Sequence, residues 1–296
     1  MLRSLLVIAT FALPWSVVAQ TYPPPQYPPA PGGPSQYSPE QLDQIVGRIA
    51  LYPDPLLAQV LAASTFWDEV PDAAAWARAH SYLDPETKAR AINDDHLPWD
   101  PSILGLLQFP SVLDQMANDM SWTQALGNAV LSDRAAVMDA VQHQRQLALN
   151  YGYLASNAYY RVVPAPGDIQ ILQVDPTWIY VPYYDPRVVY YRPRSGFFVG
   201  GAITFGPRIF IGGAFAPFGW GGIGLNWRSH FLVLNGRSWD RRFDNRDRYV
   251  HRYDYARPRY EGPRVEHHEM HEYREPEHRA PERRAPEHRE HEHDRH

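Results

Sequence analysis

The sequence predicts a mainly α protein, with a compact multi-helix N-terminal domain, then a short β and Gly/aromatic-rich region, and a disordered, charged, His-rich tail. Three observations lead to this fold class. Apolar residues recur at helical spacing between residues 38 and 160. β-branched and aromatic runs separated by turn residues fill 161–192, and a charged segment poor in apolar residues occupies 241–296. The 29 prolines are concentrated toward the two ends of the chain, so its foldable part is expected within about residues 38–260.

The first nineteen residues have the layout of a secretory signal peptide. Arg3 precedes an apolar stretch at 5–13, which is too short to span a bilayer of about 30 Å. Val17 and Ala19 stand at positions −3 and −1 of a cleavage site. The chain has no cysteine, which excludes disulfides, thiolate metal ligands and lipoprotein anchoring. We expect an exported protein that is not a lipoprotein, with an uncleaved anchor as the alternative.

Residues 20–37 form a Pro/Tyr-rich linker. Seven prolines are interleaved with Tyr22, Tyr27 and Tyr37, a composition that favours extended polyproline II and cannot form a core. A semi-rigid spacer is the preferred interpretation, and a ligand for a proline-binding module is the alternative.

Capping signals divide 38–160 into six or seven short helices. Ser38 and Gln41 fit the N-cap and N3 positions of a capping box. An aspartate followed by proline is expected to cap three further helices, at Asp54, Asp84 and Asp100. Ser132 is expected to cap the last long helix. Such a domain is large enough to bury a sizeable core.

The segments after the helical domain are expected to be mostly extended. Residues 161–192 predict two or three short strands, the last of them after Asp185. Residues 193–240 are rich in glycine and aromatics, and Gly206-Pro207-Arg208 is expected to turn a hairpin there. This Gly/aromatic region could also offer an exposed surface to a partner.

Several motifs in order along the chain carry a family resemblance. They include IALYPDPLLAQVLAAST at 49–65, PWDPS at 98–102 and YVPYYDP at 180–186. Over about residues 40–190 the chain resembles the bacterial family catalogued as domain of unknown function 3300. That resemblance implies an exported protein of the periplasm or cell envelope of a Gram-negative bacterium, and it implies no activity and no catalytic residues.

Enzymatic chemistry finds little support in the sequence. There is no serine nucleophile elbow and no His-Glu-x-x-His motif. The nearest approach to paired carboxylates for acid–base work comes from Asp68-Glu69, Asp94-Asp95-His96 and Asp100, so a glycan-active enzyme is the third choice of function. Four tryptophans are expected to be core side chains, with sugar stacking as the alternative: Trp67, Trp76, Trp99 and Trp122.

A binding or scaffold role is the preferred function. Aromatic residues beside prolines form a rigid, amphipathic surface of the kind enriched at interfaces, namely Trp178, Tyr180, Tyr183, Tyr184 and Tyr190. The partner is expected to be an envelope protein or the membrane surface. Nucleic acid is not expected, because the net charge is −5 and no basic face emerges.

The tail at 241–296 provides the second choice of function. It concentrates the imidazoles that could bind zinc, nickel or copper, and their charge could respond to pH. These candidate ligands are His267, His268, His271, His288, His291, His293 and His296. No other cofactor is expected.

Overall fold

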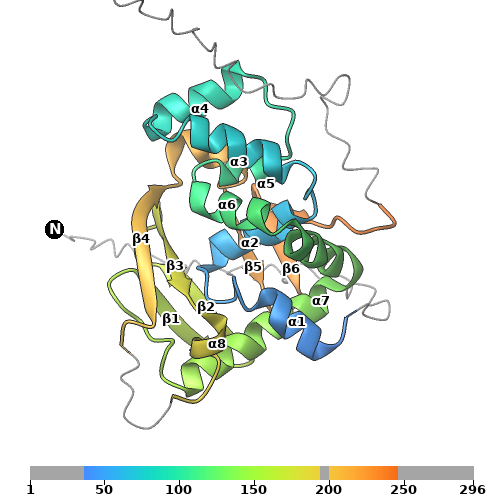
Figure 1. Cartoon of the computed structure of the whole chain (residues 1–296), viewed down its shortest axis with the longest axis vertical. Helices are drawn as coiled ribbons and strands as arrows, with labels where there is room; N and C mark the ends of the chain where they lie inside the picture. Colours follow the sequence, from blue (N-terminus) through green and yellow to red (C-terminus); the bar gives the residue numbers. More distant parts are fainter. Residues whose placement is uncertain (1–36, 194–199, 246–296) are drawn as a thin grey trace, which may run out of the picture. The chain divides into compact units, whose positions relative to one another are not determined.

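The computed structural model describes residues 37–193 and 200–245. Residues 39–150 are helical, as the sequence predicts (Figure 1). Their seven helices are α1 (Pro39–Val46), α2 (Asp54–Ser64), α3 (Val70–Ala79), α4 (Pro85–Asp94), α5 (Pro101–Leu106), α6 (Pro110–Asn118) and α7 (Met120–Asn150). The predicted signal peptide, most of the linker and nearly all of the tail lie outside the described residues.

Several of these helices begin at the predicted caps. The Ser38 hydroxyl accepts a hydrogen bond from the Gln41 N–H at 3.3 Å, and the Gln41 side chain accepts from the Ser38 N–H at 2.8 Å. Asp84 and Asp100 cap α4 and α5 by accepting from backbone N–H groups at 3.0 and 2.8 Å. Because each cap is a contact within three residues, local sequence is enough to predict it.

Two capping predictions are wrong. Pro53 occupies the N-cap of α2, and the Asp54 carboxylate instead joins a buried ion pair described below. Within α7 the backbone leaves helical geometry at Asp133, whose carboxylate accepts from the Ala136 N–H at 3.0 Å. The neighbouring Ser132 hydroxyl donates to a carbonyl of the preceding turn. Asp133 is therefore the cap at the kink.

The predicted mainly α class is wrong, because the C-terminal half of the described residues is built on antiparallel sheets. The strands are β1 (Tyr160–Ala165), β2 (Asp168–Gln173), β3 (Trp178–Tyr184), β4 (Ile203–Phe210), β5 (Gly224–Asn226), β6 (Phe231–Leu234) and β7 (Arg237–Trp239). They pair as β1–β2, β3–β4 and β5–β6–β7. Residues 37–245 thus combine a helical first half with three small sheets.

The Gly-Pro-Arg hairpin is also corrected. β4 continues through Gly206-Pro207-Arg208 and pairs with β3 on both sides of an irregularity there, so that Tyr180 faces Arg208 and Tyr184 faces Ile203. A proline is tolerated because the sheet has only two strands, which leaves one edge of β4 without a ladder partner, and because the register shifts between Tyr180 and Pro182. Long-range pairing with β3 therefore replaces the predicted local turn.

The expected strand after Asp185 is a short helix. The chain forms α8 (Pro186–Val189), and Asp185 accepts a hydrogen bond from the Arg187 N–H at 2.9 Å. An aspartate cap followed by proline at the first helical position favours the start of a helix. Here this signal outweighs the strand propensity of the β-branched residues that follow.

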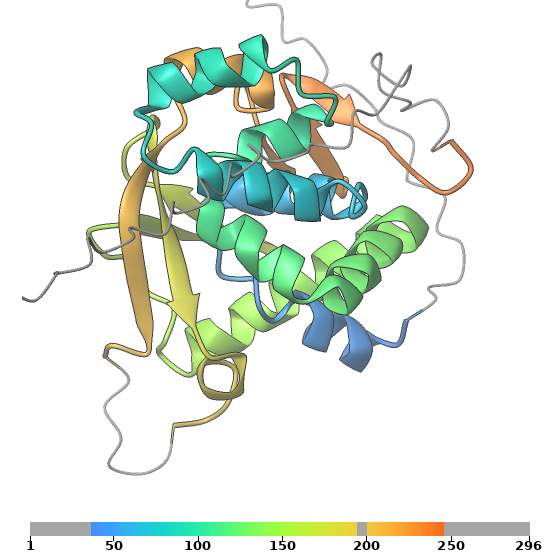
Figure 2. The same cartoon turned by 45° about the horizontal axis from the view of Figure 1, so that its top comes forward.

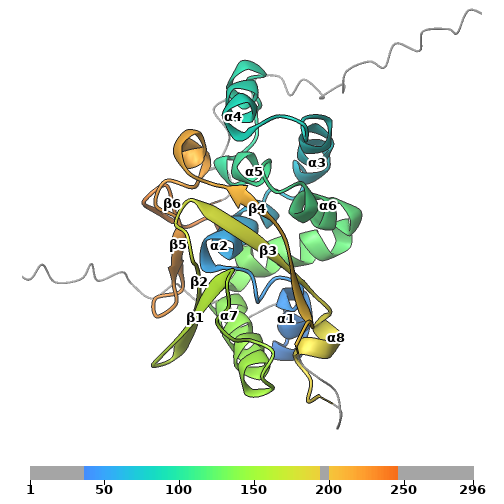
Figure 3. The same cartoon turned by 90° about the vertical axis from the view of Figure 1, so that its left-hand side faces the viewer.

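The α2 helix lies at the centre of this fold. All of its residues are buried, and it contacts α5, α7, β2, β5 and β6. In Figure 3 the β3–β4 pair crosses in front of it. A helix that is apolar on every side needs cover on every side, and the C-terminal sheets supply part of that cover. None of the helices in the described residues is long and apolar enough to cross a bilayer.

The Gly/aromatic region contributes its large rings to this core. Phe215, Trp220, Trp227 and Trp239 are all buried, so the expectation that this region exposes its aromatics is wrong for these side chains. The 3₁₀ helix η1 (Gly213–Phe218) packs against α5 and beside α4, as Figure 2 shows. The region therefore completes the helical core.

Glycines allow the closest contacts inside this core. At Gly127 of α7 an added Cβ would overlap the carbonyl oxygen of Ser64 at the end of α2. By contrast, a Cβ added at Gly224 of β5 would meet no atom within 4 Å. The backbones of α2 and α7 thus approach each other at Gly127 more closely than any side chain permits.

A candidate binding groove beside the tyrosine–proline strand

A buried ion pair holds the helices and the C-terminal strands together. Arg145 of α7 is fully buried and donates to the Asp54 carboxylate at 2.7 Å. Its remaining donors reach three backbone carbonyls, those of Ala50 at 2.8 Å, Tyr52 at 2.9 Å and Ile169 at 2.7 Å. The guanidinium is therefore bonded to the loop before α2 and to β2 at once.

The Asp54 carboxylate also accepts several hydrogen bonds. It accepts from the Ile171 N–H at 3.1 Å and from the Trp227 indole at 2.9 Å, in addition to Arg145. The Arg145 guanidinium also lies over the Trp227 ring, 4.8 Å from its centroid. Burying a charge is unfavourable unless its hydrogen bonds are made, and here both partners make several. This cluster fixes β2 and β5 against the helices.

An open groove of about 770 Å³ lies beside this framework, between α1, α7 and the chain that follows β3. We call it the tyrosine–proline groove. The segment at 184–191 contributes Tyr184, Asp185, Pro186, Arg187, Tyr190 and Tyr191 to its lining. Part of the family-like motif at 180–186 therefore lines a concave site.

Tyrosine hydroxyls anchor the floor of the groove. Tyr184 accepts from the Leu51 N–H at 3.1 Å, and Tyr190 donates to the Gly47 carbonyl at 2.8 Å. The two rings meet edge to face with centroids 6.1 Å apart. Each contact crosses more than 130 residues of sequence, so these tyrosines position the segment after β3 against α1.

Burial keeps these hydroxyls neutral. It raises the pKa of Tyr184 and Tyr190 well above the ordinary value, and it does the same for Tyr52 nearby. The phenolate is the charged form that burial disfavours. Both hydroxyls are therefore uncharged groups whose contacts, to Leu51 and Gly47, lie inside the protein.

The groove is lined by three carboxylates, Glu40, Asp43 and Asp185, and by two guanidiniums, Arg48 and Arg187. Arg48 meets Asp119 at 2.8 Å, and Arg187 meets Asp185 at 3.0 Å. Tyr191 stands at the rim with 64% of its surface exposed. Exposed charges of both signs around the groove suit a polar partner without a strong net charge.

The five aromatics predicted to bind a partner divide between two places. Tyr184 and Tyr190 lie in the groove floor, and Tyr190 is only 6% exposed. Trp178 and Tyr180 are half-buried on β3, and Tyr183 is exposed and packs over Gly206. The first two clearly support the fold, whereas the other three keep part of their surface open.

Trp178 and Tyr180 belong to a second feature, which we call the aromatic strip. Its six members come from β3, β4 and the residue before β1: Tyr159, Trp178, Tyr180, Phe205, Arg208 and Phe210. Tyr159 stacks on Phe205 with centroids 4.3 Å apart and meets Tyr180 edge to face at 4.9 Å. Opposite strands thus gather their rings on one side of the β3–β4 pair.

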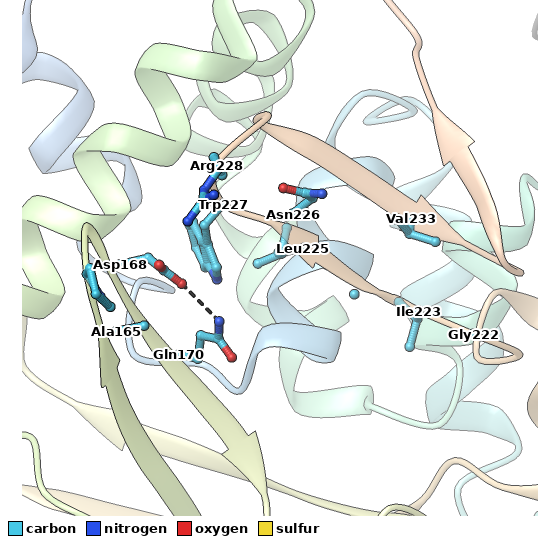
Figure 4. Close-up of a pocket in the computed structure, with 12 residues that line it drawn as sticks. Ala165, Asp168, Gln170, Gly222, Ile223, Leu225, Asn226, Trp227, Arg228 and Val233 are labelled. Atoms are coloured by element: carbon cyan, nitrogen blue, oxygen red, sulfur yellow. Dashed lines mark hydrogen bonds between the residues drawn. The ribbon is translucent and has the colours of Figure 1, made fainter. Parts of the chain in front are cut away.

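A polar cleft of about 610 Å³ separates the β1–β2 hairpin from β5 (Figure 4). Asp168 and Gln170 lie on one wall, joined by a 2.9 Å hydrogen bond, and Asn226 and Arg228 flank Trp227 on the other. Nothing in the local sequence pattern indicates this cleft, because its two walls are more than 50 residues apart.

The residues predicted as candidates for glycan chemistry have structural partners. Glu69 is buried and accepts a hydrogen bond from the Asp100 N–H at 3.0 Å, whereas Asp68 is exposed. Of the four tryptophans, Trp76, Trp99 and Trp122 are buried and Trp67 is partly so. The structure thus favours a core role for these rings over sugar stacking.

Metal ligands are not clustered in the described part of the chain. Within residues 37–193 and 200–245, no group of three or more histidines and acidic residues is placed to hold an ion. The seven candidate histidines, from His267 to His296, lie outside the described residues. Metal binding by the tail stays a prediction.

Replacing Tyr190 with phenylalanine is expected to lower the free energy of unfolding by about 1–2 kcal/mol, because the buried Gly47 carbonyl loses its donor. Urea denaturation would measure the change. Tyr191→Phe is the matched control, since that side chain is 64% exposed and should change stability by no more than about 0.5 kcal/mol. Equal stability of both variants would contradict a structural role for the Tyr190 hydroxyl.

Both the groove and the aromatic strip lie within a segment that matches a known protein family. The family model described as "Protein of unknown function (DUF3300)" matches residues 38–268. The chain is similar to the uncharacterized protein YacH of Escherichia coli (strain K12), with 34% identity over 188 residues. That match covers 53% of this chain and only 30% of the relative. No solved structure matches significantly.

Proposed function

Because the chain belongs to the DUF3300 family, as its motifs predict, and the family description assigns no activity, we propose that it acts as a non-enzymatic binding module of the bacterial cell envelope. The tyrosine–proline groove would hold the partner. The observation that carries this proposal is an open groove to whose lining the motif at 180–186 contributes Tyr184, Asp185 and Pro186.

The chemistry of the groove favours a folded protein partner. Tyrosine and arginine are enriched at protein interfaces, and Tyr191 and Arg187 are both exposed at the rim. The Tyr184 and Tyr190 hydroxyls already bond to Leu51 and Gly47, so a partner would contact the exposed residues of the rim. Because Asp185 already pairs with Arg187, a strongly anionic partner has little to gain here.

The envelope location is supported by residue pattern alone. The charged start, short apolar stretch and small residues before position 20 favour export, and the lack of cysteine suits an exported chain without disulfides. Fractionation of cells carrying the full chain would test it, with the protein expected in the periplasmic or envelope fraction and its N-terminus near Gln20.

Crosslinking in living cells followed by purification tests the binding role. Four forms are compared: the full chain, the chain without residues 261–296, a rim variant with Tyr191→Ser and Arg187→Ser, and a control with Tyr82→Ser and Arg90→Ser. The control removes the same two residue types from exposed positions near α4. One stoichiometric partner should be recovered with every form except the rim variant, which should recover it at least about tenfold less.

Two outcomes would contradict this function. A partner retained equally by the rim variant would place the interface elsewhere on the chain. Recovery of no partner with any form would argue against a binding role altogether, and metal titration of the tail would then become the leading experiment.

A further inference from the structure

The aromatic strip leaves part of its face open, although Phe205 meets the buried Tyr160 edge to face at 5.2 Å. The opposite side of β3 carries Ile179 and Val181, which are at most 1% exposed and pack inward. On the strip side Tyr159 is 40% exposed, Arg208 is exposed, and the other rings are half-buried. The sheet therefore has a buried aliphatic face and a partly open aromatic face.

The strip contains two ring clusters in a row. Tyr159, Tyr180 and Phe205 form one, and Trp178 with Phe210 forms the next, at 5.2 Å between centroids. The Arg208 guanidinium lies 4.4 Å from the Trp178 centroid, on the rim of the second cluster. Aromatic rows of this kind are what polyproline segments dock against in many recognition domains.

The chain itself carries a matching ligand in its linker. A proline stands at every third position in one register, at Pro25, Pro28, Pro31 and Pro34, and Tyr22 and Tyr37 extend the same register at either end. Polyproline II has three residues per turn, so these side chains would form one continuous ridge along the helix. We call them the proline ridge.

The linker is also long enough to reach the strip. Residues 20–36 precede Tyr37, where the described part of the chain begins. At about 3.1 Å per residue, seventeen residues of polyproline II extend about 53 Å. A compact domain of about 200 residues has a radius of gyration of about 16 Å, so the linker can span its surface.

We propose that the proline ridge of residues 25–34 docks on the aromatic strip of the same chain. Proline rings pack against aromatic faces, and a polyproline segment loses little conformational entropy on binding because its backbone is already extended. Tethering raises the effective concentration of the linker to the millimolar range, which fills even a weak site. This inference is independent of the proposed role of the tyrosine–proline groove.

The absence of cysteine from the chain makes a direct test possible. The full-length protein is purified with the pair Gln26→Cys and Arg208→Cys, which places one thiol next to the ridge and one on the strip. The comparison pair is Gln26→Cys and Tyr82→Cys, because Tyr82 is 79% exposed and lies near α4. Copper–phenanthroline oxidises both, and non-reducing electrophoresis separates crosslinked monomers from dimers.

The expected result is an intramolecular disulfide in the Arg208→Cys pair that forms at least about tenfold faster than in the Tyr82→Cys pair. A matched control lies within the linker. Serine at Pro25, Pro28 and Pro31 removes the ridge, whereas serine at Pro23, Pro24 and Pro29 removes three prolines outside it. The first set should abolish the rate difference, and the second should preserve it.

Three outcomes would overturn the proposal. Equal rates in the two cysteine pairs would show that the linker has no preference for the strip. A rate difference that survives loss of the ridge would mean that the prolines do not mediate the contact. A disulfide-linked dimer as the main product of the Arg208→Cys pair would assign the strip to the linker of a second copy.

Discussion

Replacing Arg145 with methionine is expected to lower the free energy of unfolding by about 3–5 kcal/mol. The change leaves the Asp54 carboxylate buried without its cation and removes the donor from three backbone carbonyls. It also removes the guanidinium that covers the Trp227 ring. Methionine keeps the unbranched stem but is shorter than arginine, so the loss combines the missing charge and hydrogen bonds with a cavity where the guanidinium lay.

Urea denaturation followed by far-UV circular dichroism would measure this effect. Arg187→Met is the matched control, because Arg187 pairs with Asp185 at 3.0 Å but its side chain is 88% exposed. That variant should change stability by less than about 1 kcal/mol. If Arg145→Met were no more destabilising than Arg187→Met, the buried cluster would not be what holds the strands to the helices.

A second variant separates an unpaired charge from lost packing. In the Arg145→Met background, Asp54→Asn removes the carboxylate charge while keeping an oxygen that can accept from the Ile171 N–H. The double variant should recover part of the lost stability. A double variant that is less stable than Arg145→Met alone would indicate that the bonds from Asp54 to β2 and Trp227 matter more than its charge.

Gly127→Ala is expected to lower the free energy of unfolding by about 3 kcal/mol or prevent folding. The new Cβ would overlap the Ser64 carbonyl, which is backbone and cannot move without shifting α2. Overpacking a rigid site typically costs about 1–3 kcal/mol, and backbone contacts lie at the upper end. The higher helix propensity of alanine offsets about 1 kcal/mol at most.

The control for this change is Gly224→Ala in β5. Its added Cβ would meet no atom within 4 Å, so stability should change by no more than about 0.5 kcal/mol. Thermal unfolding of both variants gives the comparison. A Gly127→Ala protein as stable as the Gly224→Ala protein would show that α2 and α7 can separate without loss of stability.

The helical half of the fold could be predicted because its signals are local. Asp84 and Asp100 accept hydrogen bonds from backbone N–H groups two or three residues away, and a short sequence motif is enough to predict such contacts. Asp54 carries the same Asp-Pro pattern, yet its partner is Arg145, 91 residues further on. No local pattern distinguishes a capping aspartate from one that a distant arginine neutralises.

The C-terminal half is less predictable for the same physical reason. Gly206-Pro207-Arg208 has the composition of a turn, and only pairing with β3 keeps it extended. The sequence does contain one sign that other segments must cover α2. Residues 54–64 lack a polar face, which indicates a helix enclosed on all sides. That pattern shows that a cover is needed, although it does not identify which segment supplies it.

The candidate site could be predicted in part. The motif at 180–186 contributes Tyr184, Asp185 and Pro186 to the groove lining, and partner binding by its aromatics stays a prediction. The inward direction of Tyr184 and Tyr190 depends on hydrogen bonds to Leu51 and Gly47, more than 130 residues earlier. The contribution of α1 to the groove therefore could not be read from the motif itself.

The Asp54 cluster also bears on how fast the chain reaches this structure. The indole of Trp227 bonds to a carboxylate 173 residues earlier, and Tyr184 meets Leu51 across 133 residues. Folding rates fall as contacting residues lie further apart in sequence, because a long loop must close before its contact forms. We therefore expect slow refolding. The N-terminal helices should collapse early, and α2 should become fully buried only when the last strands pack against it. A ribosome-bound fragment ending before residue 227 would lack the indole that completes this cluster.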